Sequence, residues 1–236
     1  MIDRARSVLK RHGLFGTLGV LVRKAQAVLR EHSPERKRHL QEQLDFDRKY
    51  GVDTTTKLAV SSLDLEGPNA ASAFGYQATG ITPFLNLIRA FPISHADFTF
   101  VDLGCGKGRP LLLASHFPFR KVVGVEFSSM LAGIARKNVQ NYRDPAQKCL
   151  DIEVVCQDAS QYDPPPGNIL IYMYNPFLEG VMLPALDRLH RAALAGRNRT
   201  IEILYVNPTL RHVMDPLPYL KVVSSEEDKC HYRIVP

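Results

Sequence analysis

The sequence predicts an α/β protein built on a doubly wound, mostly parallel seven-strand sheet with an antiparallel C-terminal strand pair and an N-terminal helical extension. From residue 98 onward, continuous apolar runs of strand length alternate with helical segments, which is typical of a parallel sheet covered on both faces. The last two runs are joined by a short polar loop, which indicates an antiparallel pair. The charge of the first forty residues sets the extension apart from this core.

Length and composition restrict the class of protein. The 236 residues suffice for one large domain with a small extension. Apolar residues make up 45% and charged residues 23%, which excludes a wholly disordered or fibrous chain. The longest apolar runs, such as Gly13–Val22, have about ten residues, whereas a membrane-spanning helix needs about twenty, so we expect no transmembrane segment.

The basic charge is confined to the N-terminus, where residues 1–45 are predicted to form a basic amphipathic helical arm. Residues 1–40 hold ten Lys/Arg and three Asp/Glu, and the other 196 residues hold twenty and twenty-one. Within residues 14–30, apolar residues form one stripe of a helix, and a second helical stretch runs to about Tyr50. The stripe is suited to packing on the main domain or on a second copy of the chain, or to lying on an anionic membrane surface. With its basic residues, the arm is also suited to binding nucleic acid.

Four cysteines show no CxxC pair and no histidine at ligand spacing, so neither a metal site nor a disulfide framework is expected. No small-residue cleavage site follows the N-terminal apolar stretch, so we expect no secretory signal. These features favour a reduced, cytoplasmic protein, peripheral to a membrane if the arm binds lipid.

Residues 46–97 are predicted to form an irregular and helical cap over a site. Residues 51–82 are rich in Gly, Pro, Ser, Thr and Asn and carry little periodicity. Thr82 followed by Pro83 predicts a helix start, with threonine as the N-cap, and Pro92 predicts its end.

Residues 98–236 are predicted to form the core. The expected strands are 98–104, 121–127, 151–158, 168–174, 200–206, 219–223 and 231–235, and the expected helices are 108–116, 130–142 and 181–194. A short proline-rich turn, rather than a long helix, follows the third strand.

The segment VDLGCGKG, at 101–108, is the most informative motif. A buried strand ends in an acid, Asp102, and glycines follow at alternate positions, where a backbone can turn sharply and approach a ligand. A dinucleotide site normally reads G-x-G-x-x-G, but Arg109 stands where the third glycine would be. The acid would repel a pyrophosphate and attract an ammonium group, which favours a cationic nucleoside over a dinucleotide.

Two further acids end the next strands. Glu126 lies 24 residues after Asp102, where a carboxylate can accept hydrogen bonds from ribose hydroxyls, and Asp158 ends the third strand, where it can reach a base. Ligands of open α/β sheets bind at the carboxyl ends of strands, so the three acids together indicate one ligand site.

The motifs VDLGCGKG, GVEFS, CQDAS and YNPF resemble those of class I, Rossmann-like S-adenosylmethionine-dependent methyltransferases, from Phe98 to the C-terminus. The resemblance implies that Asp102, Gly104 and Gly106 surround the methionine part of S-adenosylmethionine. It also implies that Glu126 binds the ribose hydroxyls and that Asp158 lies near the adenine amine.

FDRKYGVDT with GYQATG is similar to the region before the first motif in some seven-strand lysine methyltransferases, where a Tyr and a Ser/Thr line the cofactor. The matching residues are Tyr76 and Thr79. Asn175-Pro176-Phe177 resembles the N/D-P-P-Y/F loop of amino-methylating enzymes without its second proline.

We assign Asn175, Pro176 and Phe177 as candidate catalytic residues. An asparagine oxygen and a backbone carbonyl can accept hydrogen bonds from an amine, and the ring can pack on a planar or cationic group. The alternative is a plain proline turn with Phe177 in the core. Cys105 is expected to be a small buried residue rather than a nucleophile, and Lys107 and Arg109 are expected either to be solvated or to contact the cofactor carboxylate.

The predicted function is methyl transfer from S-adenosylmethionine to a nitrogen of a protein lysine or another amine. The alternatives are a nucleic-acid methyltransferase that uses the basic arm, a nucleoside-binding regulator without catalysis, and a dinucleotide oxidoreductase.

Overall fold

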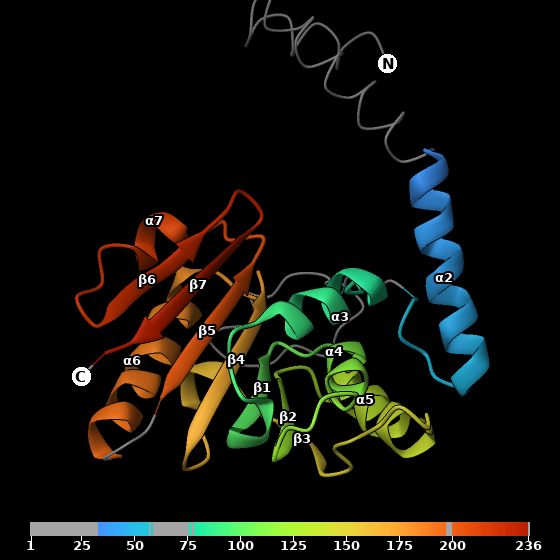
Figure 1. Ribbon diagram of the computed structural model, residues 1–236, viewed down its shortest axis with the longest axis horizontal. Coiled ribbons are helices and arrows are strands. Elements are labelled where there is room, and N and C mark those ends of the chain that lie inside the picture. Colours follow the sequence, from blue (N-terminus) through green and yellow to red (C-terminus); the bar gives the residue numbers. More distant parts are fainter. Residues whose placement is uncertain (1–32, 57, 59–75, 77, 197–199, 236) are drawn as a thin grey trace, which may run out of the picture. The chain divides into compact units, whose positions relative to one another are not determined.

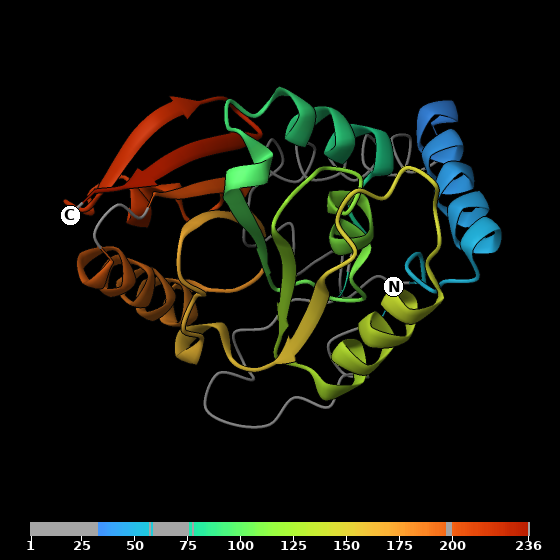
Figure 2. The same cartoon turned by 60° about the horizontal axis from the view of Figure 1, so that its bottom comes forward.

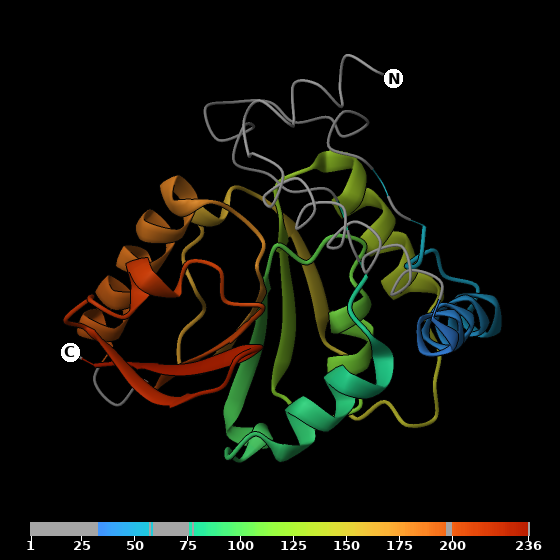
Figure 3. The same ribbon diagram turned by 90° about the horizontal axis from the view of Figure 1, so that it is seen from above.

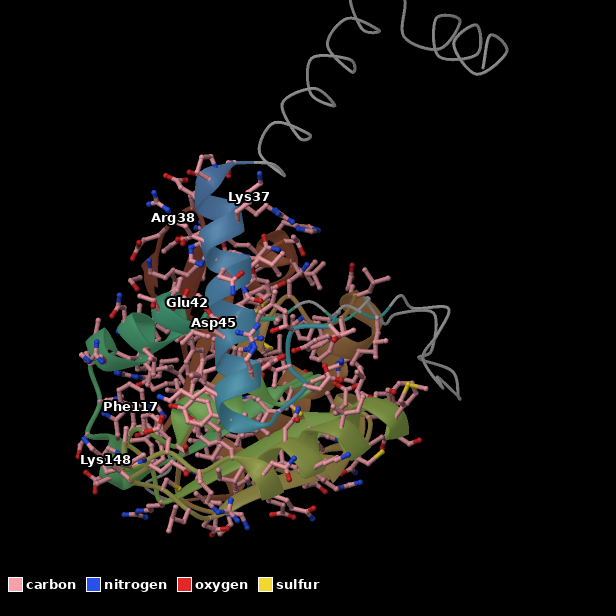
Figure 4. All side chains as sticks on the ribbon, turned by 90° about the vertical axis from the view of Figure 1, so that its right-hand side faces the viewer. Lys37, Arg38, Glu42, Asp45, Phe117 and Lys148 are labelled. Carbon is pink, nitrogen blue, oxygen red and sulfur yellow. The ribbon has the colours of Figure 1, made fainter. Side chains whose placement is uncertain are left out.

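The computed structural model describes residues 33–56, 58, 76, 78–196 and 200–235, and the chain divides into two units, Met1–Leu44 and Asp45–Pro236. The amphipathic stripe predicted at 14–30 lies outside the described residues. Helix α2 (Pro34–Tyr50) begins in the first unit and ends at Tyr50, as predicted. Figure 4 labels Lys37, Arg38 and Glu42 on its first-unit part. None of the helices in the described ranges has the length and apolarity needed to cross a bilayer.

The second unit contains one seven-stranded sheet with the strand order β3-β2-β1-β4-β5-β7-β6 (Figure 1). Strands β3, β2, β1, β4 and β5 are parallel, and β7 is antiparallel to both β5 and β6. The strands are β1 (Phe98–Leu103), β2 (Lys121–Glu126), β3 (Ile152–Cys156), β4 (Asn168–Tyr174), β5 (Ile201–Val206), β6 (Leu220–Ser225) and β7 (Lys229–Ile234). The predicted fold, including its antiparallel pair, is confirmed.

Helices cover both faces of this sheet, as Figures 2 and 3 show for α3 and α6. One face packs α3 and α4 in a core that includes Phe84, Phe100 and Leu112. The other face packs α6 in a core that includes Val101, Ile171 and Leu186. The helices are α3 (Ile81–Ala90), η3 (His95–Asp97), α4 (Arg109–Ala114), α5 (Ser129–Asn141), η4 (Ala159–Gln161), α6 (Glu179–Ala195) and α7 (Arg211–Met214).

Helix α3 begins earlier than predicted. Gly80, not Thr82, is its N-cap, and the Phe84 amide donates to the Gly80 carbonyl at 3.2 Å. The helix includes Ile81 because this side chain is buried in the core, and that burial outweighs the local preference for threonine as a cap. Pro83 therefore lies at the third helical position and packs against Gly80, where an added Cβ would be 3.3 Å from its ring.

Strand order places the predicted acids side by side. Asp158 follows β3, Glu126 ends β2 and Asp102 lies near the end of β1, and these are three adjacent strands. Asp102 pairs in register with Gly124 on β2 and with Tyr172 on β4. The site is therefore formed at the carboxyl ends of β3, β2, β1 and β4.

Candidate functional site

The loop between β1 and α4, residues 104–108, is held in a glycine-dependent conformation. Gly104, Gly106 and Gly108 have φ of 84°, 55° and 81°, a region that favours glycine. The amides of Gly104 and Cys105 both donate to the Val125 carbonyl, at 2.8 and 3.0 Å, so the loop is fixed to the end of β2.

Two side chains of the chain itself pack against this loop. A Cβ on Gly104 would lie 2.4 Å from the Cβ of Pro176, and a Cβ on Gly106 would lie 2.4 Å from the ring of Tyr76. The structure thus brings Pro176 and Tyr76, both predicted site residues, into contact with the predicted glycines. Tyr76 is held there because its hydroxyl donates to the Thr54 carbonyl at 2.6 Å.

Asp102 presents a buried carboxylate to the loop. The residue is 2% exposed, and its Oδ2 has no hydrogen-bond partner among the described residues. Burial, with a smaller contribution from the Glu126 carboxylate, raises the pKa of Asp102 well above its usual range. A buried acid without a partner is costly for the fold alone, and a cationic group placed beside it would relieve that cost.

Glu126 is bound to the same loop. Its Oε2 accepts the Gly106 amide at 2.8 Å, and its Oε1 accepts the Ser128 amide at 2.9 Å. Asp158 follows the neighbouring strand and caps η4 by accepting the Ser160 amide at 2.8 Å. The ribose and adenine roles of these two acids stay predictions.

Thr79 joins the cap to the sheet near Asp102. Its side chain hydrogen-bonds Tyr172, the neighbour of Asp102 on β4, and both residues are buried. Burial is the main cause that raises the pKa of Tyr172, and the Asp102 carboxylate adds to it. Thr79 therefore lies on the Asp102 side of the sheet edge, together with Tyr76.

The two cations of the glycine motif are interior side chains. The Lys107 side chain is 1% exposed and forms an ion pair with Asp53 at 2.8 Å. The Arg109 guanidinium is completely buried and donates to Thr54 Oγ1 at 2.7 Å, Thr55 Oγ1 at 2.6 Å and the Thr79 carbonyl at 3.1 Å. Arg109 therefore uses the position of the third dinucleotide glycine to bind the cap segment.

Asp47 and Asn138 complete this attachment. Asp47 lies 3.6 Å from the Arg109 guanidinium and accepts the amides of Thr54 and Thr55 at 2.8 and 2.7 Å. The Asn138 Nδ2 donates to the carbonyls of Asp53 and Lys107, each at 2.9 Å. No local sequence pattern marks these residues. The sequence shows an arginine where a dinucleotide motif has glycine, and once that arginine is buried it requires anionic or polar partners.

The loop after β4 differs from its predicted role in two respects. Asn175 has φ of 42°, and its Oδ1 accepts the hydroxyls of Tyr205 at 3.1 Å and Thr209 at 2.6 Å. Both lone pairs of that oxygen are thus used within the chain, and it does not present them to an amine. Phe177 is 7% exposed and lies in the core cluster beside α6, as the alternative interpretation predicted.

A known protein family matches the part of the chain that holds the site. Residues 100–195 match the model of a family described as a methyltransferase domain, a stretch that runs from β1 to the end of α6. It includes the glycine loop, the three acids and the loop after β4. A search of curated proteins returns no significant match.

Several solved structures are similar. A SAM-dependent methyltransferase from Aquifex aeolicus is 15% identical with a TM-score of 0.49, over 64% of this chain and 89% of its own. An RNA methyltransferase from Salinibacter ruber, in complex with S-adenosyl-L-homocysteine, is 19% identical with a TM-score of 0.41, over 65% and 88%. The 23S rRNA methyltransferase ErmE is 14% identical with a TM-score of 0.46, over 66% and 68%. These similarities are too distant to indicate an acceptor.

The strand order and the glycine loop followed by strand-end acids agree with the class I, Rossmann-like methyltransferases that the sequence motifs resemble. The match of residues 100–195 to a methyltransferase-domain model supports an S-adenosylmethionine-dependent methyltransferase. The residues present fit this cofactor, because the buried Asp102 oxygen, which has no hydrogen-bond partner among the described residues, is an acceptor suited to an ammonium group.

Proposed function

We propose that this methyltransferase transfers the methyl group to an amine nitrogen, of a protein lysine or of another amine. The observation that carries the proposal is the loop after β4, which contacts the glycine loop through Pro176 and Gly104. The loop consists of Asn175, Pro176 and Phe177, and none of these side chains removes a proton at neutral pH. A neutral amine needs no such group, because its nitrogen already carries the attacking lone pair.

The chain's residues would share the work as follows. Asp102 would bind the ammonium of the cofactor, Glu126 its ribose hydroxyls and Asp158 its adenine amine, while Tyr76 and Thr79 cover the site from the cap. When bound, the sulfonium supplies an electrophilic methyl group with a good leaving group. The protein then has to align the acceptor nitrogen and exclude water, and effects of this kind contribute several kcal/mol to catalysis.

The loop carbonyls after β4 would accept hydrogen bonds from the amine and direct its lone pair towards the methyl group. The Asn175 oxygen was the side-chain candidate for this task, but it is occupied by Tyr205 and Thr209. Backbone carbonyls at the same strand end are acceptors that need no proton-transfer chemistry.

The test is an assay of the purified chain with methyl-labelled S-adenosylmethionine and three acceptor fractions of a lysate, namely protein, nucleic acid and small molecules. We expect label in acid-stable N-methyl groups of the protein or small-amine fraction. The rate should rise with pH, because a lysine ammonium, with a pKa of about 10.4, must lose its proton before it reacts. Label in oxygen or carbon acceptors alone would contradict the proposal.

Nucleic acid is the second candidate, favoured by the concentration of basic residues in positions 1–40. If it is the acceptor, label appears in the nucleic-acid fraction, binding weakens steeply with salt, and deletion of residues 1–40 removes most of that salt dependence. A regulator without catalysis would bind S-adenosylmethionine and label none of the three fractions.

A further inference from the structure

Two neighbouring strands of the sheet end in asparagines of the same backbone conformation. Asn175 follows β4 with φ of 42°, and Asn207 follows β5 with φ of 51°. Their preceding residues, Tyr174 and Val206, are paired in register. Asparagine tolerates this left-handed region better than most residues, so both positions are explained by the turn alone. The side chain of Asn175, however, is also held by two hydroxyl groups.

Both hydroxyl groups face the oxygen end of the Asn175 amide. The Tyr205 hydroxyl accepts the Leu210 amide at 3.3 Å and lies 3.1 Å from the Asn175 side chain. Its own proton is directed at Asn175, where the facing atom is the oxygen Oδ1. Thr209 Oγ1 donates to the same oxygen at 2.6 Å. The other end of the amide is the NH₂ group, which can only donate.

This NH₂ group lies at the edge of the site. Asn175 is partly exposed, and the next residue, Pro176, packs on Gly104 of the glycine loop. In the part of the chain that the structure describes, no residue accepts a hydrogen bond from Asn175 Nδ2. The Asn175 side chain is therefore oriented by its own protein but retains a donor for another molecule.

We propose that Tyr205 and Thr209 are positioning residues that make Asn175 a hydrogen-bond donor to the methyl acceptor. The acceptor substrate then carries a hydrogen-bond acceptor, such as a carbonyl oxygen or a ring nitrogen, close to the methylated nitrogen. This inference rests on the proposed nitrogen methylation and narrows it. Of the amines proposed above, it selects an amide-bearing or heteroaromatic amine over a lysine side chain or another simple alkylamine.

The variant Asn175→Asp removes the donor and adds a negative charge, and the control carries the same added charge. A carboxylate still accepts from Tyr205 and Thr209, and aspartate also tolerates the left-handed region, but the NH₂ group is lost. Asn207→Asp is the matched control, because it makes the same chemical change in the same backbone conformation on the adjacent strand, at an exposed position.

Turnover is measured on whichever lysate fraction the wild type labels. Asn175→Asp should lower kcat/KM for that acceptor at least about tenfold, the effect of one hydrogen bond of roughly 1.4 kcal/mol, with unchanged affinity for S-adenosylmethionine. Asn207→Asp should behave as the wild type. The double variant Tyr205→Phe, Thr209→Val should also lower kcat/KM, because it frees the amide to rotate. Wild-type turnover by Asn175→Asp would overturn the inference.

A second measurement needs no acceptor. The side-chain NH₂ resonances of Asn175, assigned in the nuclear magnetic resonance spectrum by their loss in Asn175→Asp, should exchange rapidly with solvent in the wild type. Protected NH₂ protons would show that this end of the amide faces the hydroxyls, and would overturn the inference. If the wild type labels no nitrogen acceptor, the proposed function fails, and this exchange still decides the orientation of Asn175.

Discussion

Replacing Arg109 by methionine should detach the cap segment 47–55 from the glycine loop. The guanidinium is wholly buried and donates to the side chains of Thr54 and Thr55, with Asp47 3.6 Å away. Methionine is similar in length and has neither the charge nor the donors. Asp47, whose side chain is only 14% exposed, would lose its cationic partner.

The expected cost follows from the burial of this pair. Removing one partner of a buried ion pair costs about 3–5 kcal/mol, because the other charge is left uncompensated. Asp47 keeps the hydrogen bonds from the amides of Thr54 and Thr55, so we expect the lower end, about 3 kcal/mol. Domains are stable by only about 5–15 kcal/mol, so this loss is large.

The assay is urea denaturation of the whole chain, combined with hydrogen exchange of the Thr54 and Thr55 amides. The control is Arg120→Met, whose side chain is 59% exposed and lies 3.8 Å from Asp97. Exposed pairs of this kind contribute about 0–1 kcal/mol. The reasoning is refuted if Arg109→Met costs no more than Arg120→Met, or if the two threonine amides keep their protection.

Two other predictions concern the loop and its acid. Gly106→Ala should destabilise the domain by about 1–2 kcal/mol and weaken cofactor binding, because Gly106 has a positive φ and Tyr76 occupies the position of the added Cβ. The control is Gly133→Ala, at an open helical position, which should stabilise the domain by up to about 1 kcal/mol. Urea denaturation measures both changes. Asp102→Asn should stabilise the cofactor-free protein at about pH 8, and this gain should shrink towards about pH 4. The raised pKa of Asp102 means that its neutral form stabilises the folded wild type, and the wild type loses that stability as the pH rises above about 3.9, the pKa of an unfolded aspartate. An Asp102→Asn variant less stable than the wild type at the higher pH would contradict this.

The strands and the strand-end acids could be predicted from the sequence because their signals are local. A run such as residues 169–173 is continuously apolar and buried, so its character is visible within a few residues. The glycines of the loop are visible for the same reason, since each satisfies a requirement of its own backbone. The order of parallel strands then placed Asp102, Glu126 and Asp158 on one edge.

The rest depends on contacts between distant segments. Arg109 binds Asp47, Thr54 and Thr79, and no periodic pattern connects these positions. The start of α3 at Ile81 was missed because a core contact outweighed a local cap. The Asn175 oxygen accepts hydrogen bonds from Tyr205 on β5 and from Thr209 in the loop after it. These two residues lie about thirty positions further along the chain, and no local motif connects them with Asn175.

The central claim is that the unpartnered Asp102 carboxylate binds the ammonium of the methyl donor. The most direct test is calorimetric titration of the wild type and Asp102→Asn with S-adenosylmethionine and with 5′-methylthioadenosine, which lacks the amino-acid part. The substitution should weaken S-adenosylmethionine binding about 10- to 150-fold, the equivalent of roughly 1.5–3 kcal/mol, and leave methylthioadenosine binding unchanged. Equal affinity of both proteins for S-adenosylmethionine would contradict the account.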